Sequence, residues 1–152
     1  MKLDNFALDL LRRFPLGFVA TVTEDGRPAV SPKGTFIALD QETIAFGDIR
    51  SPGTLANLIA RPDVEVNFID PFLRKGIRVR GRAQVVLHGS AEFDVLLPRW
   101  QEIWSALAPR IKHIVRIPVE QLKLVTTPPY DDGVTEKEMV ALYKQKFAEL
   151  YP

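Results

Sequence analysis

Alternation of apolar and polar residues is the feature that most limits the fold of this sequence. In residues 76–87, GIRVRGRAQVVL, the apolar Ile77 and Val79 alternate with Arg78 and Arg80. Successive side chains of a β-strand point to opposite faces, so this pattern predicts a strand with one buried and one charged face.

Several other stretches have the alternation or the β-branched and aromatic content of strands. They are residues 17–23, 29–34, 35–39, 43–46, 64–70 and 113–125. Asp25 and Gly26 form a turn signal between the first two, which predicts a β-hairpin. Because these strands follow one another without regular intervening helices, the sequence favours antiparallel pairing over a parallel sheet.

Helical periodicity predicts three or four helices at the periphery, at residues 1–14, 54–60, 91–107 and 135–150. Pro98 must kink or restart the third, and Thr135 with Glu138 forms a capping box at the start of the last. The side chains expected to face inward are Leu55, Leu58, Ile59, Trp100, Trp104, Met139, Tyr143, Phe147 and Leu150. We therefore predict a mainly β protein, a small antiparallel barrel with helices, as a single domain over residues 1–152.

Composition excludes several classes of function. The formal net charge of +1 argues against a protein that works by general attraction to nucleic acid, and no apolar run is long enough to span a membrane. The absence of cysteine excludes disulfides, thiol chemistry and cysteine metal sites, and it fits the cytoplasm, where we expect the protein to act. His88 and His113 have no metal-ligand spacing, so we predict no metal site.

Residues 45–58, AFGDIRSPGTLANL, carry the strongest functional signal. A strand end runs through a polar turn with Arg50 and Ser51 into a helix start at Gly53 and Thr54. The first backbone N–H groups of a helix have no partner inside it, and they carry partial positive charge. Two hydroxyls and a guanidinium at this point predict an anion site, most simply for phosphate. The alternative is that Ser51 or Thr54 is only an N-cap.

The order of these segments resembles the flavin-binding split barrel of pyridoxamine 5′-phosphate oxidase-like proteins. The segments are AVSPKG, AFGD, RSPGTLANL, PDVEVNFID and GIRVRGRAQVV, within residues 14–90. The later stretch KHIVRIPVEQLKLVTTPPYDDG is similar to the late strand and tail of smaller family members. The resemblance implies a six- to seven-stranded antiparallel split β-barrel that binds FMN at the interface of a homodimer.

The same resemblance implies the residues that contact FMN. Lys33 would face the flavin phosphate, Phe46 to Asp48 would run beside the ring system, and Ser51 with Thr54 would supply groups to the phosphate. The full set of expected cofactor-binding residues is Val30, Ser31, Pro32, Lys33, Phe46, Gly47, Asp48, Arg50, Ser51 and Thr54. In a dimer, Lys75, Arg78 and Tyr130 are further candidates from the second subunit.

Two departures from the family pattern limit what is carried over. Several family members have consecutive basic residues after the serine, whereas this chain has Pro52 and Gly53, so Lys33, Arg50 and the helix start must balance the phosphate charge. The chain ends KQKFAELYP, without the arginine and histidine that hold the substrate phosphate in true pyridoxamine 5′-phosphate oxidases. We therefore do not expect oxidation of pyridoxamine phosphate.

The resulting hypothesis is an FMN-dependent oxidoreductase that moves electrons or hydride from a reduced nicotinamide-type donor to an unknown small acceptor. No general acid or base is visible in the sequence, so the catalytic residues are unknown and the flavin would carry the chemistry. One alternative is a deazaflavin-dependent reductase. Another is a non-catalytic module that binds flavin or haem or senses redox state, and haem would need His88 or His113 as its ligand.

Overall fold

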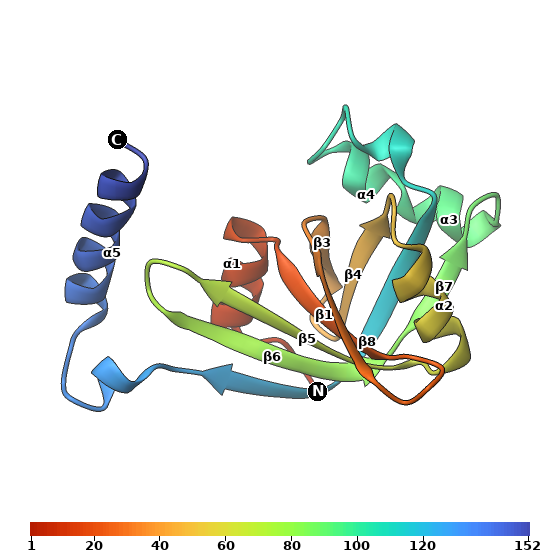
Figure 1. Cartoon of the computed structure of the whole chain (residues 1–152). Helices are drawn as coiled ribbons and strands as arrows, with labels where there is room; N and C mark the ends of the chain where they lie inside the picture. Colours follow the sequence, from red (N-terminus) through yellow and green to blue (C-terminus); the bar gives the residue numbers. More distant parts are fainter.

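An antiparallel sheet of eight strands forms the body of the protein in the computed structural model, which describes residues 1–152 (Figure 1). The strands are β1 (Gly17–Val22), β2 (Pro28–Lys33), β3 (Phe36–Asp40), β4 (Thr43–Asp48), β5 (Asp63–Asp70), β6 (Lys75–Arg82), β7 (Gln84–Leu87) and β8 (His113–Val125). They follow the order β2-β1-β5-β6-β8-β4-β3, and β7 pairs with β8 beside this path. The predicted antiparallel split barrel is therefore confirmed.

The long strand β8 makes the sheet curl. Its first half, from His113 to Pro118, pairs with β4, while its second half, from Val119 to Val125, pairs with β6. Residues 76–87, expected as one strand, divide at Ala83 into β6 and β7 because both lie along β8 at different points. The backbone at the break is close-packed, since a Cβ on Gly81 would lie 2.3 Å from the Pro118 carbonyl oxygen.

The helices of the protein are α1 (Asn5–Arg13), α2 (Pro52–Ala60), α3 (Ala91–Leu96), α4 (Pro98–Gln101) and α5 (Glu136–Leu150), with short 3₁₀ turns η1 (Ala108–Arg110) and η2 (Pro128–Tyr130). Helix α1 lies against the concave side of the sheet, α2 to α4 lie at one end of it, and α5 stands apart (Figure 1). Pro98 does restart the third predicted helix, which is shorter than expected and ends in turns. The helices are not long and apolar enough for any of them to cross a membrane.

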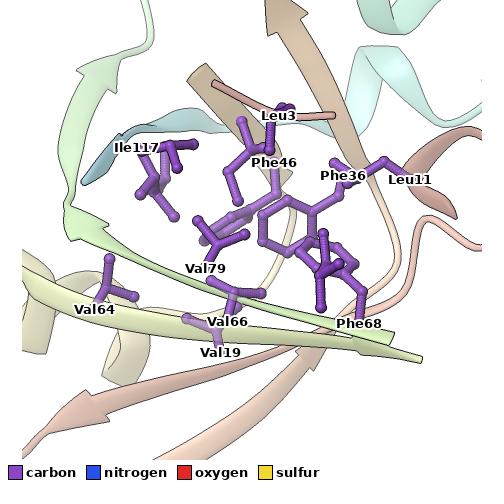
Figure 2. Close-up of a cluster of buried hydrophobic side chains, with 14 of the residues drawn as sticks. Leu3, Leu11, Val19, Phe36, Phe46, Val64, Val66, Phe68, Val79 and Ile117 are labelled. Atoms are coloured by element: carbon purple, nitrogen blue, oxygen red, sulfur yellow. The ribbon is translucent and has the colours of Figure 1, made fainter. Parts of the chain in front are cut away.

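The main core fills the concave side of the sheet (Figure 2). Phe36 from β3 lies between Phe46 of β4 and Phe68 of β5, with ring centroids 5.1 and 4.8 Å apart. Helix α1 closes this side with Leu10 and Leu11, which are both buried. This burial of large apolar side chains is the main favourable contribution to folding, and it fixes β4 at the centre of the protein.

A second, smaller core lies under α3 and α4 and includes Phe93, Trp100, Ile111 and Ile114. Trp100 is fully buried, as predicted for a core position. This second core lies next to the end of β4, which the site described below also uses.

Two side chains expected to be buried are exposed. Ile59 is 66% exposed and Leu150 is 68% exposed, so the prediction was wrong at both positions. Ile59 lies on the outer side of a short helix whose inner side is formed by Leu58, which is buried, and by Leu55, which packs against the main core. Leu150 lies in the last turn of α5, which stands apart from the sheet (Figure 1), and Phe147 instead contacts Phe72 at a centroid distance of 5.0 Å.

The outer face of β5 and β6 carries the arginines that alternate with the core residues. Arg78 and Arg80 both pair with Glu65, at 3.2 and 3.3 Å, and Arg82 pairs with Asp63 at 3.1 Å. We call Arg78, Arg80 and Arg82 the arginine stripe. The predicted charged strand face is confirmed. Each of its three arginines has an acidic partner within the chain, although Arg78 and Arg80 share one carboxylate.

Candidate anion and cofactor site

Lys33, at the end of β2, joins two parts of the chain that the sequence separates. Its Nζ donates a hydrogen bond to the Ser31 hydroxyl at 2.8 Å and a second to the Ser51 hydroxyl at the start of α2. The Lys33 ammonium and the Ser51 hydroxyl, two of the groups predicted to contact a phosphate, therefore lie together, and the Ser31 hydroxyl joins them. Thr54 lies in the first turn of the helix and is partly buried.

Ser51 occupies the N-cap position of α2, but its side chain makes no capping hydrogen bond. The predicted N-cap position is thus confirmed, but the Ser51 hydroxyl accepts a hydrogen bond from Lys33 and does not cap the helix. The backbone N–H groups of the first turn, at Gly53 and Thr54, are left without that cap, which is the arrangement that favours an anion. A hydrogen bond from the Asn57 amide to the Thr21 hydroxyl, at 3.0 Å, anchors α2 to β1.

A cavity of about 230 Å³ opens at this point, and Lys33, Arg50 and Ser51 line it together with the backbone of Gly34 and Gly47. We call it the Lys33 cavity. Its volume is several times the roughly 30 Å³ that one water molecule takes up, which leaves room for a phosphate group. The space beside Gly34 and Gly53 is open, because a Cβ at either position would meet no atom within 4 Å.

The surroundings of Lys33 disfavour its charged form. Burial lowers the pKa of the Lys33 ammonium below its ordinary value, and the nearby Asp48 carboxylate opposes this shift. Asp48 is itself only 2% exposed, and its Oδ1 has no hydrogen-bond partner. A bound phosphate would favour the charged form of Lys33, because an adjacent opposite charge raises the pKa of an ammonium.

Thr35 fixes the floor of the Lys33 cavity. Its hydroxyl donates to the Gly47 carbonyl at 2.8 Å and accepts from the Gly47 N–H at 3.0 Å. The buried Trp100 donates its indole N–H to the Thr35 carbonyl at 2.8 Å. Sequence reasoning missed this support, although a threonine directly after Lys33 and Gly34 was a signal that the turn could be held by a hydroxyl.

The remaining predicted contacts lie around this cavity in different ways. Val30 on the edge strand β2 is 65% exposed, and Pro32 is also exposed. Phe46 is fully buried, with its ring in the main core (Figure 2). Gly47 has a packing reason to lack a side chain, since a Cβ there would lie 2.6 Å from Cδ1 of Ile111. Contact of these four residues with a cofactor stays a prediction.

The candidates for contacts from a second subunit have partners within the chain. Lys75 pairs with Glu136 at 2.9 Å and lies 4.2 Å from the centroid of the Tyr130 ring, while the Tyr130 hydroxyl donates to the Leu73 carbonyl. These contacts hold the segment after β8 against the turn between β5 and β6. Whether Lys75, Arg78 or Tyr130 reaches a cofactor across a dimer stays a prediction.

The family model for pyridoxamine 5′-phosphate oxidase matches residues 3–127, and the chain belongs to this family. The resemblance inferred from the sequence is thereby confirmed. The match covers the whole sheet and the Lys33 cavity and ends before α5. No curated protein sequence matches the chain significantly.

Solved structures share the fold. HupZ from Group A Streptococcus superposes with a TM-score of 0.71 at 22% identity, over 82% of this chain and 95% of that chain. An FMN-binding protein from Syntrophomonas wolfei gives 0.66 at 16% identity, over 80% and 85%. An F420 reductase gives 0.62 at 22% identity, over 80% and 98%. At these identities the likeness shows a shared fold alone.

Proposed function

We propose that this protein binds FMN and acts as an oxidoreductase, taking electrons or hydride from a reduced nicotinamide-type donor and passing them to a small acceptor. The observation that carries this proposal is the convergence of the Lys33 ammonium with the Ser31 and Ser51 hydroxyls beside the uncapped first turn of α2. Membership of the pyridoxamine 5′-phosphate oxidase family and the fold shared with an FMN-binding protein give further support.

The residues of the Lys33 cavity fit the phosphate of FMN chemically. A phosphate monoester has up to two negative charges and three acceptor oxygens, which are best satisfied by charge-assisted hydrogen bonds. Within the cavity, Lys33 and Arg50 supply the charge, Ser51 supplies a hydroxyl, and Thr35 keeps the Gly47 backbone in position. The Ser31 hydroxyl, bonded to Lys33, and the N–H groups of the first turn of α2 are further donors beside it. When bound, the flavin ring itself supplies the redox chemistry, so the chain needs no acid or base of its own.

We further propose that FMN is held between two copies of the chain. The strand that carries Lys33 is an edge strand, and the neighbouring surface exposes large apolar side chains. Val30 is 65% exposed, while Phe18 and Val22 on β1 are 38% and 39% exposed. A second copy packed here would remove this apolar surface from water and cover the ring of a flavin whose phosphate lies at Lys33.

Spectroscopy of freshly purified protein tests the main proposal. We expect the visible absorption of oxidised flavin, release of a compound with the mass of FMN, and bleaching when NADH or NADPH is added without oxygen. Bound FMN that stays oxidised would favour a carrier or a redox sensor. A haem spectrum, or a protein that neither contains nor binds FMN, would overturn the proposal.

A charged substitution on the edge strand tests the dimer. We expect Val30→Glu to shift the mass in solution from dimer to monomer and to lower FMN retention. Val95→Glu is the matched control, because Val95 is 75% exposed on α3, away from β2. Full FMN occupancy in a monomeric Val30→Glu protein would contradict a cofactor shared between subunits.

A deazaflavin-dependent reductase is the second candidate, favoured by the fold shared with an F420 reductase. The same Lys33 cavity could hold the phosphate of that cofactor. The mass of the released compound separates the two possibilities directly. A cytoplasmic location stays a prediction from the composition.

A further inference from the structure

A second and larger cavity lies on the other side of the loop that follows β4. Its volume is about 610 Å³, and it is bounded by the end of β7, the turn η1 and the start of β8. The polar side chains that line it are Arg50, His88, Arg110, Lys112 and His113, and no carboxylate is among them. We call it the basic cavity. Only Ile49 and Arg50 are shared with the Lys33 cavity.

The cations of the basic cavity have no partner within the chain. Arg50, Arg110 and Lys112 take part in none of the ion pairs of the structure, and their side chains make no hydrogen bond. Like charges that converge without a counter-charge repel one another, so the cluster gives no evident stability to the fold. A bound anion would remove that repulsion.

The backbone around the basic cavity is firmly held. The Lys112 N–H donates to the Asp48 carbonyl at 2.7 Å, and His113 lies opposite Asp48 on β4 and opposite Leu87 on β7. Ile111, between Arg110 and Lys112, is buried in the second core. The backbone that carries the cationic side chains is therefore held in place, so no loop has to be ordered when these side chains close on a ligand.

The two histidines add a directed donor. The His88 backbone N–H donates to Nδ1 of His113 at 3.3 Å, so Nδ1 acts as an acceptor. In the neutral imidazole, Nε2 then carries the hydrogen and can donate it to a ligand. The cavity thus combines two guanidinium groups, one ammonium and one imidazole N–H, and phosphate and carboxylate oxygens are the acceptors that suit this set.

We propose that the basic cavity binds an anionic group with two or more negative charges, a phosphate or a polycarboxylate, separately from the group held at Lys33. Its role as a subsite for the electron donor or acceptor rests on the proposed flavin function. Arg50, which borders both cavities, would lie between the two anions. A redox partner of this protein would accordingly carry phosphate or several carboxylates.

Calorimetric titration of the FMN-saturated protein with pyrophosphate and with citrate tests the proposal. We expect saturable binding at low ionic strength that weakens as salt is added. The double variant Arg110→Ala/Lys112→Ala should bind the preferred probe about tenfold more weakly or worse, because it loses two charged donors. A preference for pyrophosphate would indicate a phosphate ligand, and a preference for citrate a polycarboxylate.

The matched control is Lys137→Ala/Lys144→Ala, which removes the same charge from exposed positions on α5, on the other side of the molecule (Figure 1). This control should change the affinity for the probe less than twofold. Equal weakening in both double variants would mean general attraction to positive charge and would overturn the proposal. Absence of binding to the unmodified protein would overturn it as well.

The Lys33→Ala variant separates this proposal from the flavin function. It should lose affinity for FMN and keep the titration with pyrophosphate or citrate, since Lys33 does not line the basic cavity. If the unmodified protein does not bind FMN, the Lys33 cavity is empty and could itself take up the probe. The Lys33→Ala substitution removes this second site from the titration. The comparison between Arg110→Ala/Lys112→Ala and its control, both made in the Lys33→Ala background, then tests the anion site independently of FMN.

Discussion

Two groups of basic residues in this protein look alike in the sequence and differ in the structure. In the arginine stripe, the antiparallel register of β5 and β6 sets Arg80 opposite Glu65 and Arg82 opposite Asp63, and each arginine has an acidic partner. Around the Lys33 cavity and the basic cavity, Arg50 has no such partner and Lys33 contacts only hydroxyls directly. Strand register therefore pairs the arginines of the stripe, whereas cations at strand ends and in loops stay available to a ligand.

The difference also has an energetic side. Exposed ion pairs such as those of the stripe contribute little to stability, but they give every arginine an acidic partner. At Lys33, by contrast, burial disfavours the ammonium and lowers its pKa, so the fold holds this charge at a cost. Local conflicts of this kind are expected at functional sites, where another partner supplies the compensation.

Removal of the Lys33 charge should have the largest effect. We expect Lys33→Ala to weaken FMN binding by about 1.5–3 kcal/mol, which is roughly ten- to 150-fold, because a charge-assisted hydrogen bond to the phosphate is lost. Fluorescence titration with FMN measures the change. Riboflavin, which lacks the phosphate, should bind almost equally to both proteins. A matching loss with riboflavin would mean that Lys33 supports the fold instead.

The affinity for FMN should also fall as the pH rises through the lowered pKa of Lys33. Phosphate binds the ammonium form of Lys33, so the affinity is highest below the pKa of the free site. Between this pKa and the raised pKa of the complex, Lys33 takes up a proton when FMN binds, and the affinity falls as the pH rises. The charged groups that bear on Lys33 are Asp48 on β4, which raises its pKa, and Arg50, which lines the same cavity.

Titrations with FMN and riboflavin over a pH series check this expectation. The ring titrates in both ligands, so the ratio of the two affinities isolates the phosphate contact. The ratio should fall with rising pH in the unmodified protein, towards the value for Lys33→Ala. A ratio with the same pH dependence in Lys33→Ala would assign the effect to another group.

Thr35→Val tests the floor of the Lys33 cavity. Valine keeps the shape but leaves the buried Gly47 N–H without its acceptor, so we expect a loss of about 1–3 kcal/mol in the free energy of unfolding, together with weaker FMN binding. Denaturant unfolding measures the first effect. Thr43→Val is the matched control, since both threonines are 6% exposed. Thr43 lies at the start of β4, whereas Thr35 contacts Gly47 near its end. Equal losses at both positions would deny Thr35 a special role.

Much of the fold could be predicted because its signals are local. Residues 113–125 alternate clearly and form β8 with the expected bounds, and the Thr135 capping box starts α5 with its hydroxyl accepting from the Glu138 N–H. The segment 76–87 shows the limit of such signals. Its alternation continues across Ala83, but the division into β6 and β7 depends on where β8 passes, which is a tertiary property.

The site was predictable only in part for a similar reason. Lys33 and Ser51 were chosen on residue type and a family resemblance, and the structure brings them together. The link from Trp100 to Thr35 spans 65 residues and has no local pattern. The basic cavity was missed because its cations come from separate segments, and each of them alone resembles an ordinary surface residue.

Arg80→Ala should have the smallest effect and tests the comparison from the other side. The Arg80 side chain is 59% exposed, and Glu65 keeps Arg78 as a partner at 3.2 Å, so we expect less than about 1 kcal/mol of lost stability. FMN affinity should stay the same, because Arg80 is paired with Glu65 within the chain. Denaturant unfolding and FMN titration measure the two quantities. A clear loss of FMN affinity in a stable Arg80→Ala protein would mean that the stripe reaches the flavin of a second subunit, and pairing within one chain would then be a poor guide to which charges bind ligands.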